Sequence, residues 1–227
     1  MNIKSYAHLL VIPFGLAILL AGCASPSIMD NARNSSEVTA ESYSQHRSAK
    51  GVVLLEVNWG REWSCGGYQN AELRGFGFDR VPSKAKSNDE AADLMLMAGP
   101  NLLQRSEFTS YAVLVEPGEY ALAGFVIKVA ESISKIDYWA ANRSDLMKSG
   151  KYQGGQFNVA EGETVYIGGF GLNCSRAPQI WRYQTKEGED FNSYLAALRK
   201  KYPFIDLKQV RVRLFQTSKF AYPSAKQ

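Results

Sequence analysis

The apolar residues of this chain fall mainly into short runs with a period of two, separated by turn residues. Such runs are typical of β-strands, in which successive side chains point to opposite faces. In the clearest run, 51–59, every second residue from Val53 to Trp59 is apolar, so we expect one face in a core and the other partly wet. Further strands are predicted near 73–78, 107–115, 119–130, 155–160, 163–172, 178–185 and 207–217.

Two turn motifs connect four of these runs in pairs. The motif EPGE at 116–119 follows the run 107–115, and EGE at 161–163 follows the run 155–160. Proline fixes φ at the first central position of a turn, and glycine supplies a positive φ at the next. We therefore predict two β-hairpins and, with them, an antiparallel β-sheet core.

From residue 189 the pattern changes to a helical period. Apolar side chains recur three or four residues apart from Phe191 to Leu198, and basic residues occupy 199–201. Cations in the last turn suit the negative end of the helix dipole, and Pro203 cannot continue a helix. These features predict an amphipathic helix over 189–201.

Three other segments have less regular patterns. Ser87 and Glu90 have the spacing of a capping box, which predicts a helix over 88–98. The segment 131–150 fits either a helical turn or a long loop. In the last strand, apolar residues are expected to face the core and basic residues the solvent: Val210, Val212 and Leu214 inward, Arg211 and Arg213 outward.

The first residues of the chain predict an export signal. Lys4 precedes an apolar run, 9–20, which is too short for a stable membrane span and fits the core of a signal peptide. The sequence LAGC that ends at Cys23 resembles the lipobox of bacterial lipoproteins. The resemblance implies removal of the signal peptide, 1–22, and acylation of Cys23 with palmitate or another fatty acid. The alternative is an ordinary secretory signal with a chance cysteine.

The cellular location of the protein is predicted from the same resemblance. More than one acyl chain gives stable anchoring, so the mature protein is expected to stay on a membrane. Ala24, in place of Asp, implies the outer membrane of a Gram-negative cell, with the domain facing the periplasm. Residues 23–50 hold few large apolar side chains and are predicted to be a flexible tether, which leaves 51–227 as one folded domain.

Beyond Cys23 the chain has only Cys65 and Cys174. Both lie beside predicted strand ends, and the periplasm is oxidising, so we predict a disulfide between them; two free thiols are the alternative. The bond would close a long loop and stabilise the fold by up to about 4–5 kcal/mol in the chain-entropy model.

A broader resemblance rests on the motifs EPGEYAL and FNVAEGETVYIG, together with the lipobox and the polar linker. These motifs are similar to those of bacterial envelope lipoproteins that carry an immunoglobulin-like or transthyretin-like domain of unknown function. The resemblance covers about residues 110–173 and implies an antiparallel β-sandwich, here decorated with one or two α-helices. It brings no catalytic residues, because its motifs form turns and core strands.

Charge and chemistry narrow the function classes. The chain has 26 Lys and Arg against 22 Asp and Glu, and its basic residues are scattered, so nucleic acid is not an expected partner. Apart from the signal region, the only histidine is His46, in the predicted tether, so no Ser-His-Asp triad, His-ligated metal site or cofactor site is predicted in the domain. The S-x-x-K matches at 132–135 and 83–86 lack the companion motifs of penicillin-binding enzymes.

The aromatic residues near Cys65 and in the segment 131–150 are the remaining candidates for a binding site. They are Trp63, Tyr68, Tyr138 and Trp139. Exposed aromatics can anchor a protein partner or stack on sugars; alternatively, Trp59 and Trp181 are core residues and the others surround the disulfide. We therefore expect a non-catalytic outer-membrane lipoprotein that acts as an interaction or accessory module for an envelope protein, or else a module that binds glycan or peptidoglycan.

Overall fold

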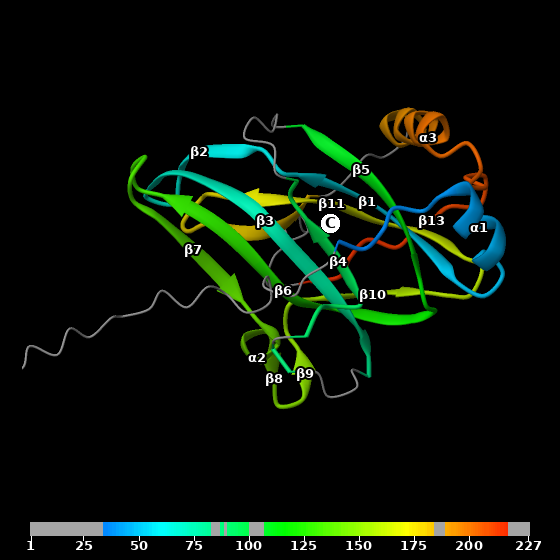
Figure 1. The fold of residues 1–227 in the computed structure, drawn as a ribbon, viewed down its shortest axis with the longest axis horizontal. Coiled ribbons are helices and arrows are strands. Elements are labelled where there is room, and N and C mark those ends of the chain that lie inside the picture. The colour runs from blue at the N-terminus through cyan, green and yellow to red at the C-terminus, as the bar shows by residue number, and fades with distance from the viewer. Residues whose placement is uncertain (1–33, 83–86, 89, 100–106, 184–188, 218–227) are drawn as a thin grey trace, which may run out of the picture.

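The computed structural model describes residues 34–82, 87, 88, 90–99, 107–183 and 189–217. Its fold is mainly β, with two sheets that pack face to face as a sandwich (Figure 1). Three helices occur in the described residues, in place of the expected one or two. The predicted class, a β-sandwich with few helices, is confirmed, whereas its relation to immunoglobulin-like or transthyretin-like domains stays a prediction.

Sheet A contains the central strand β1, which is parallel to β11 and antiparallel to β5. Its strands in spatial order are β12 (Gln179–Tyr183), β11 (Thr164–Asn173), β1 (Gly51–Asn58) and β5 (Phe108–Val115), with β13 (Arg211–Val212) beside β11. Strand β1 is buried on both faces, so the prediction of a wet face was wrong. Its second face is covered by helices that lie outside the sheet, a long-range packing that a strand pattern does not reveal.

Sheet B is antiparallel throughout and is built around the long strands β3 and β6. Its strands are β10 (Gln156–Val159), β6 (Gly118–Ala130), β3 (Tyr68–Val81) and β2 (Arg61–Cys65), with β4 (Leu94–Met97) beside β3 and β7 (Ile136–Ala141) beside β6. A separate small hairpin joins β8 (Met147–Lys148) to β9 (Lys151–Tyr152).

The core between the sheets is rich in aromatic rings. Phe76 and Phe78 of β3 contact Phe170 of β11 at centroid distances of 5.1 and 5.8 Å, and Phe215 lies 5.6 Å from Phe170. A second apolar cluster lies outside sheet A, where α3 (Glu189–Lys201) covers Leu54. The predicted helix at 189–201 and the predicted strand near 178–185, which is β12, are both confirmed.

The two predicted hairpins are wrong, because each turn carries the chain from one sheet to the other. Strand β5 pairs with β1 in sheet A, whereas β6 pairs with β3, β7 and β10 in sheet B. In the same way, β10 belongs to sheet B and β11 to sheet A. The turn residues set the change of direction as expected, but pairing is set by distant strands, which local turn chemistry does not specify.

The segment 34–50 is part of the folded domain, which corrects the prediction of a flexible tether there. The Ser35 N–H donates to the Met95 carbonyl at 2.8 Å, and the Val38 N–H donates to the Ala112 carbonyl at 2.9 Å. Helix α1 (Ala40–His46) follows, capped by Thr39, and buries Tyr43 against the cluster outside sheet A. We call residues 34–38 the N-terminal strap, because they pair with β4 of sheet B and with β5 of sheet A. Residues 1–33, which include the predicted signal peptide and Cys23, lie outside the described residues.

The other side of the sandwich is closed by a C-terminal strap, residues 211–217. The Arg213 N–H donates to the Tyr166 carbonyl of sheet A at 2.9 Å, and the Gln216 N–H donates to the Gln156 carbonyl of sheet B at 2.8 Å. The predicted orientation is wrong for Val212, which is 54% exposed, whereas Phe215 is buried. This segment pairs partly with sheet A and partly with sheet B. The alternation of inward and outward side chains expected for one regular strand therefore does not hold along it.

Two other predictions need correction. The segment 88–98 contains strand β4 instead of a helix, because pairing of 94–97 with β3 outweighs local helix propensity. The capping contact itself forms, because the Ser87 N–H donates to Glu90 Oε1 at 3.2 Å. However, it is followed by a single turn and not by a helix. The ambiguous segment 131–150 contains β7, the short helix α2 (Arg143–Leu146) and β8. Among the described residues, no helix has the length and apolar character needed to cross a membrane.

Candidate functional site

Strands β2, β3, β6 and β7 lie side by side in this order at one end of sheet B (Figure 1). Exposed aromatic and charged side chains gather on the outer face of these strands. Directly opposed residues in antiparallel strands lie on the same face of a sheet. Two such rows cross the four strands here: Trp63, Asn70, Ala130 and Ile136 in one, and Arg61, Glu72, Lys128 and Tyr138 in the next. We call these two rows, with the adjacent Arg74, the outer-face site.

The charged centre of the outer-face site is the buried carboxylate of Glu72. Arg61 Nε lies 2.6 Å from Glu72 Oε1, and Arg74 Nη1 and Lys128 Nζ lie 3.6 and 3.9 Å from Glu72 Oε2. The three cations are partly exposed and exceed the single carboxylate by two positive charges. The carboxylate holds Arg61 by a short hydrogen bond and attracts the other two cations, while the excess positive charge favours a partner with an acidic or electron-rich group.

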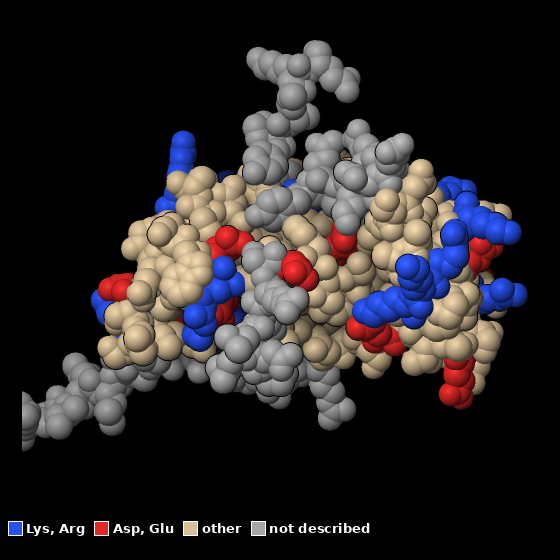
Figure 2. All heavy atoms as spheres, turned by 90° about the horizontal axis from the view of Figure 1, so that it is seen from above, with Lys and Arg blue, Asp and Glu red and all other residues tan. Residues whose placement is uncertain are grey.

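The charge is local. On the face drawn in Figure 2, Lys and Arg side chains lie in separate groups, several of them next to acidic side chains, and not as one continuous basic surface. A patch of this kind favours recognition of a specific group over general attraction to a polyanion.

Trp63 and Tyr138 flank this charged centre on β2 and β7. Trp63 is 63% exposed, and the Arg61 guanidinium lies 5.4 Å from the centroid of its ring. Tyr138 is 51% exposed and lies directly opposite Lys128. Large exposed aromatic side chains that each lie next to a cation are typical of binding surfaces. They offer contact area at a small cost in conformational entropy.

The other two predicted aromatics form a different contact. The rings of Tyr68 and Trp139 meet edge to face at a centroid distance of 5.5 Å. Trp139 is opposite the core residue Ile127, and Tyr68 packs against the core cluster, so this pair lies at the rim of the core. The structure therefore brings Trp63 and Tyr138 onto the outer face and separates them from Tyr68 and Trp139. Trp59 and Trp181 are buried.

The disulfide holds this end of the sandwich together. Cys65 at the end of β2 bonds to Cys174, which follows β11, with the two Cα atoms 4.5 Å apart, so the predicted pairing is confirmed. Gly66 and Gly67, with φ of 58° and 90°, then turn the chain from β2 into β3. A Cβ on Gly66 would lie 2.7 Å from Ala177 Cα, so this turn is fitted closely against the loop after Cys174. The disulfide and the turn fix the position of Trp63.

Sequence reasoning missed the charged residues of the site. A local signal existed on β2, where Arg61 and Trp63 alternate as on an exposed face. However, Glu72, Arg74 and Lys128 come from β3 and β6, and their approach to Arg61 depends on the register of three strands. Only the fold reveals that register.

His46 ends α1 at the surface, and no group of three or more His, Cys, Asp or Glu that could hold a metal occurs in the part of the chain the structure describes. In the S-x-x-K match at 132–135, Lys135 Nζ binds Glu131 Oε2 at 2.5 Å, so its ammonium is engaged away from Ser132. The match at 83–86 lies outside the described residues.

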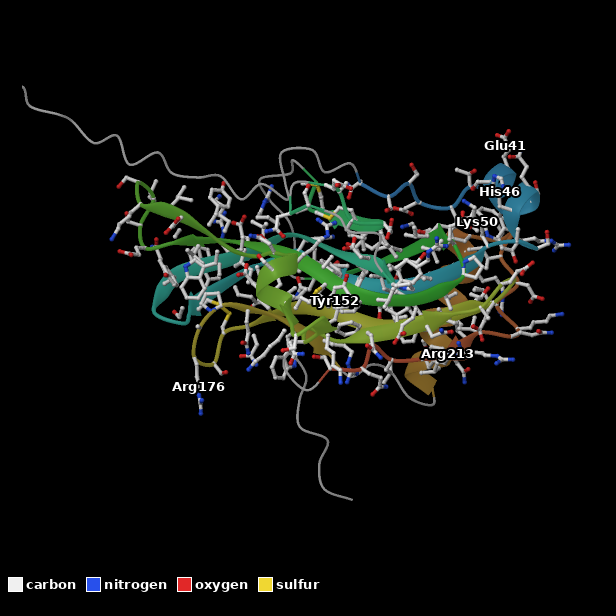
Figure 3. The ribbon with its side chains drawn as sticks, turned by 90° about the horizontal axis from the view of Figure 1, so that it is seen from below. Glu41, His46, Lys50, Tyr152, Arg176 and Arg213 are labelled. Carbon is white, nitrogen blue, oxygen red and sulfur yellow. A yellow bond between two sulfur atoms is a disulfide. The ribbon has the colours of Figure 1, made fainter. Side chains whose placement is uncertain are left out.

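A polar pocket of about 300 Å³ lies at the opposite end of the sandwich. It is lined by Lys50, Arg80, Asp93, Glu116 and Tyr120, among others. Lys50 marks this end in Figure 3, together with His46 and Glu41, while Arg176 lies at the other end. The Lys50 ammonium is 2.8 Å from Glu116, and the Tyr120 hydroxyl donates to the Glu116 carbonyl at 2.8 Å; burial raises the pKa of Tyr120 to about 12. These bonds tie the start of β1 to the turn between the sheets, which is a structural role.

No family model, curated protein or solved structure matches this chain. The proposal for its function therefore depends on the geometry of the outer-face site and on the sequence of the N-terminal region.

Proposed function

We propose that this chain is a lipid-anchored binding module of the bacterial envelope, which holds a protein partner on the outer-face site. The observation that carries the proposal is the pair of exposed aromatics, Trp63 and Tyr138, placed on either side of three cations that gather around the buried Glu72. Aromatic and arginine side chains dominate the energetics of protein interfaces. The function is binding without catalysis.

The arrangement suits an interface because its parts are held in place before a partner arrives. The Arg61 side chain makes a short bond to Glu72 and lies against the Trp63 ring. Ordering such side chains on binding normally costs about 0.5–1.5 kcal/mol each, and a site that is already ordered avoids much of that cost. A partner would therefore gain most of the contact energy of Trp63 and Arg61.

The LAGC sequence at Cys23 supports an anchored location. Acylated Cys23 would keep the domain at the periplasmic face of the outer membrane, close to other envelope proteins and to peptidoglycan. The location has its own test, because Cys23→Ser should move the protein from the membrane fraction to the soluble fraction of the periplasm. Retention of that variant on the membrane would contradict lipid anchoring through Cys23.

Binding through the outer-face site is tested by recovery of partners from detergent-solubilised envelopes with the full-length chain. We expect Trp63→Ala combined with Tyr138→Ala to lose a partner that the unchanged protein retains. Phe108→Ala is the matched control, because Phe108 is an exposed aromatic (41%) on β5 of sheet A. Equal recovery by all three proteins would contradict the proposal.

A glycan ligand is the second candidate, favoured by the exposed indole of Trp63 next to cations that could bind the carboxylates of peptidoglycan. Sedimentation with purified peptidoglycan sacculi separates the two. The glycan reading requires that the protein sediments with sacculi and that Trp63→Ala reduces this, while Phe108→Ala does not.

A further inference from the structure

Strand β7 presents backbone groups to the solvent along its outer edge. The Glu131 N–H donates to the Lys135 carbonyl at 3.0 Å, which makes these two residues a hydrogen-bonded pair in the continued register of β6 and β7. Hydrogen-bonded and non-hydrogen-bonded pairs alternate along an antiparallel ladder. The N–H and C=O groups of Ile136, Tyr138 and Ala140 therefore point away from β6.

The bond made by Tyr138 agrees with this assignment. Its N–H donates to Oδ1 of the preceding Asp137 at 2.7 Å, and so takes no part in the ladder with β6. Within the described ranges, β6 is the only strand that pairs with β7. Five of the six β7 residues are exposed and the sixth is half-buried, so the edge is accessible.

Several other edges of the sandwich are covered or irregular. The N-terminal strap pairs with β4 and β5, and the C-terminal strap pairs with β10 and β11. Strand β2 is interrupted at Ser64, whose φ of 56° breaks the extended edge. Natural proteins protect their edge strands in such ways, whereas β7 has a regular register, no proline and one charged side chain, Asp137.

We propose that β7 binds an extended peptide segment of the envelope partner as an added strand of sheet B. This inference rests on the proposed function and specifies how the partner is held. Outward N–H and C=O groups on alternate residues fit a polypeptide backbone, which is the basis of binding by strand addition. The added strand would continue the sheet next to the exposed side chains of Ile136 and Tyr138, which belong to the outer-face site.

Charge complementarity indicates the side chains of that segment. A residue of the added strand opposite Tyr138 would lie two strand spacings, about 10 Å, from Lys128. The flexible four-carbon stem of Lys128 allows its ammonium to reach toward an acidic side chain at that position. We therefore expect an acidic residue at this position, with apolar residues two positions away on the same face, opposite Ile136 or Ala140.

The test uses the full-length chain as bait for a phage-displayed library of random peptides. Enriched peptides should alternate as described, and their affinity should fall about tenfold with Ala140→Pro, because proline removes one outward N–H that the peptide backbone would accept. Since that N–H is not bonded to β6, the variant should keep the fold, as proline is tolerated on the open side of an edge strand. Ala140→Ser keeps the N–H and is the matched control.

The outcomes separate this inference from the proposed function. Peptides that bind Ala140→Pro as well as Ala140→Ser, but lose affinity with Trp63→Ala, would overturn strand addition and leave the outer-face site intact. A library that yields no binding peptide, or yields peptides that keep their affinity after N-methylation of alternate residues, would also overturn strand addition. Circular dichroism and thermal unfolding of Ala140→Pro establish that any loss of binding arises in a folded protein.

Discussion

Arg143 binds Asp79 through two hydrogen bonds, Nε to Oδ2 at 2.6 Å and Nη2 to Oδ1 at 3.1 Å, and both side chains are buried. Its third nitrogen, Nη1, donates to the carbonyls of Ser87 and Glu90 at 2.7 and 2.8 Å. One guanidinium thus joins α2, strand β3 and the segment before β4. Because α2 follows β7 directly, this contact also anchors the C-terminal end of the proposed binding edge.

Replacing Arg143 with Met should destabilise the fold by about 3–5 kcal/mol, because the variant removes the guanidinium that pairs with the buried carboxylate of Asp79. Urea denaturation measures the change. Adding Asp79→Leu to Arg143→Met should recover part of the loss, since the double variant contains no buried charge at this position. Lys135→Met is the control: its ion pair with Glu131 is exposed, and we expect no measurable change. Equal stability of Arg143→Met and the unchanged chain would contradict a structural role for the pair.

Tyr43→Ala should lower the free energy of unfolding by about 3–5 kcal/mol, because it removes a buried aromatic ring from the cluster outside sheet A. The exposed Gln45, on the same helix, gives a control variant, Gln45→Ala, that should unfold at nearly the same urea concentration as the unchanged chain. If α1 were only a mobile tether, both substitutions would be neutral. That result would remove the N-terminal segment from the folded domain.

Tyr120 should make the stability of the domain depend on alkaline pH. Burial raises the pKa of Tyr120 from 10.0 to about 12, so the folded protein keeps this proton at a pH at which the unfolded chain has released it. The contribution is present in full below pH 10 and is lost as the pH rises to about 12. Over this range the stability of the unchanged chain should fall more steeply than that of Tyr120→Phe. If the stability of the two proteins fell in parallel with rising pH, the raised pKa of Tyr120 would be contradicted.

Local sequence patterns predicted helices and strands well where one apolar face of the element is buried and the other is exposed. The helix at 189–201 has one apolar stripe and cations in its last turn, and it forms at the predicted residues. The predicted strands that became β1 and β12 were also found. Their burial was harder to predict, because β1 is covered on one side by the other sheet and on the other side by helices that come from both ends of the chain.

Patterns failed where the partner of a segment is distant in the sequence. The turn at 116–119 has the residues of a hairpin turn, but the strands on either side of it do not pair with each other. Strand β5 pairs with β1, and strand β6 pairs with β3. The N-terminal strap has a polar sequence, and it is ordered by hydrogen bonds to the distant strands β4 and β5, which involve its backbone and the side chains of Asn34 and Ser35. The outer-face site depends on the register of four strands, so Trp63 and Tyr138 could be identified as candidates, whereas their shared face with Arg61, Glu72 and Lys128 could not.

Site-specific photo-crosslinking in intact cells tests the central claim most directly. A photoreactive amino acid replaces Tyr138 on the outer-face site, and in a parallel strain it replaces Phe108 on sheet A, which has similar exposure. We predict a discrete protein adduct from position 138 that is absent from position 108 and is lost when Trp63→Ala is added. Adducts of equal yield from both positions, or none from position 138, would contradict a binding function for this face.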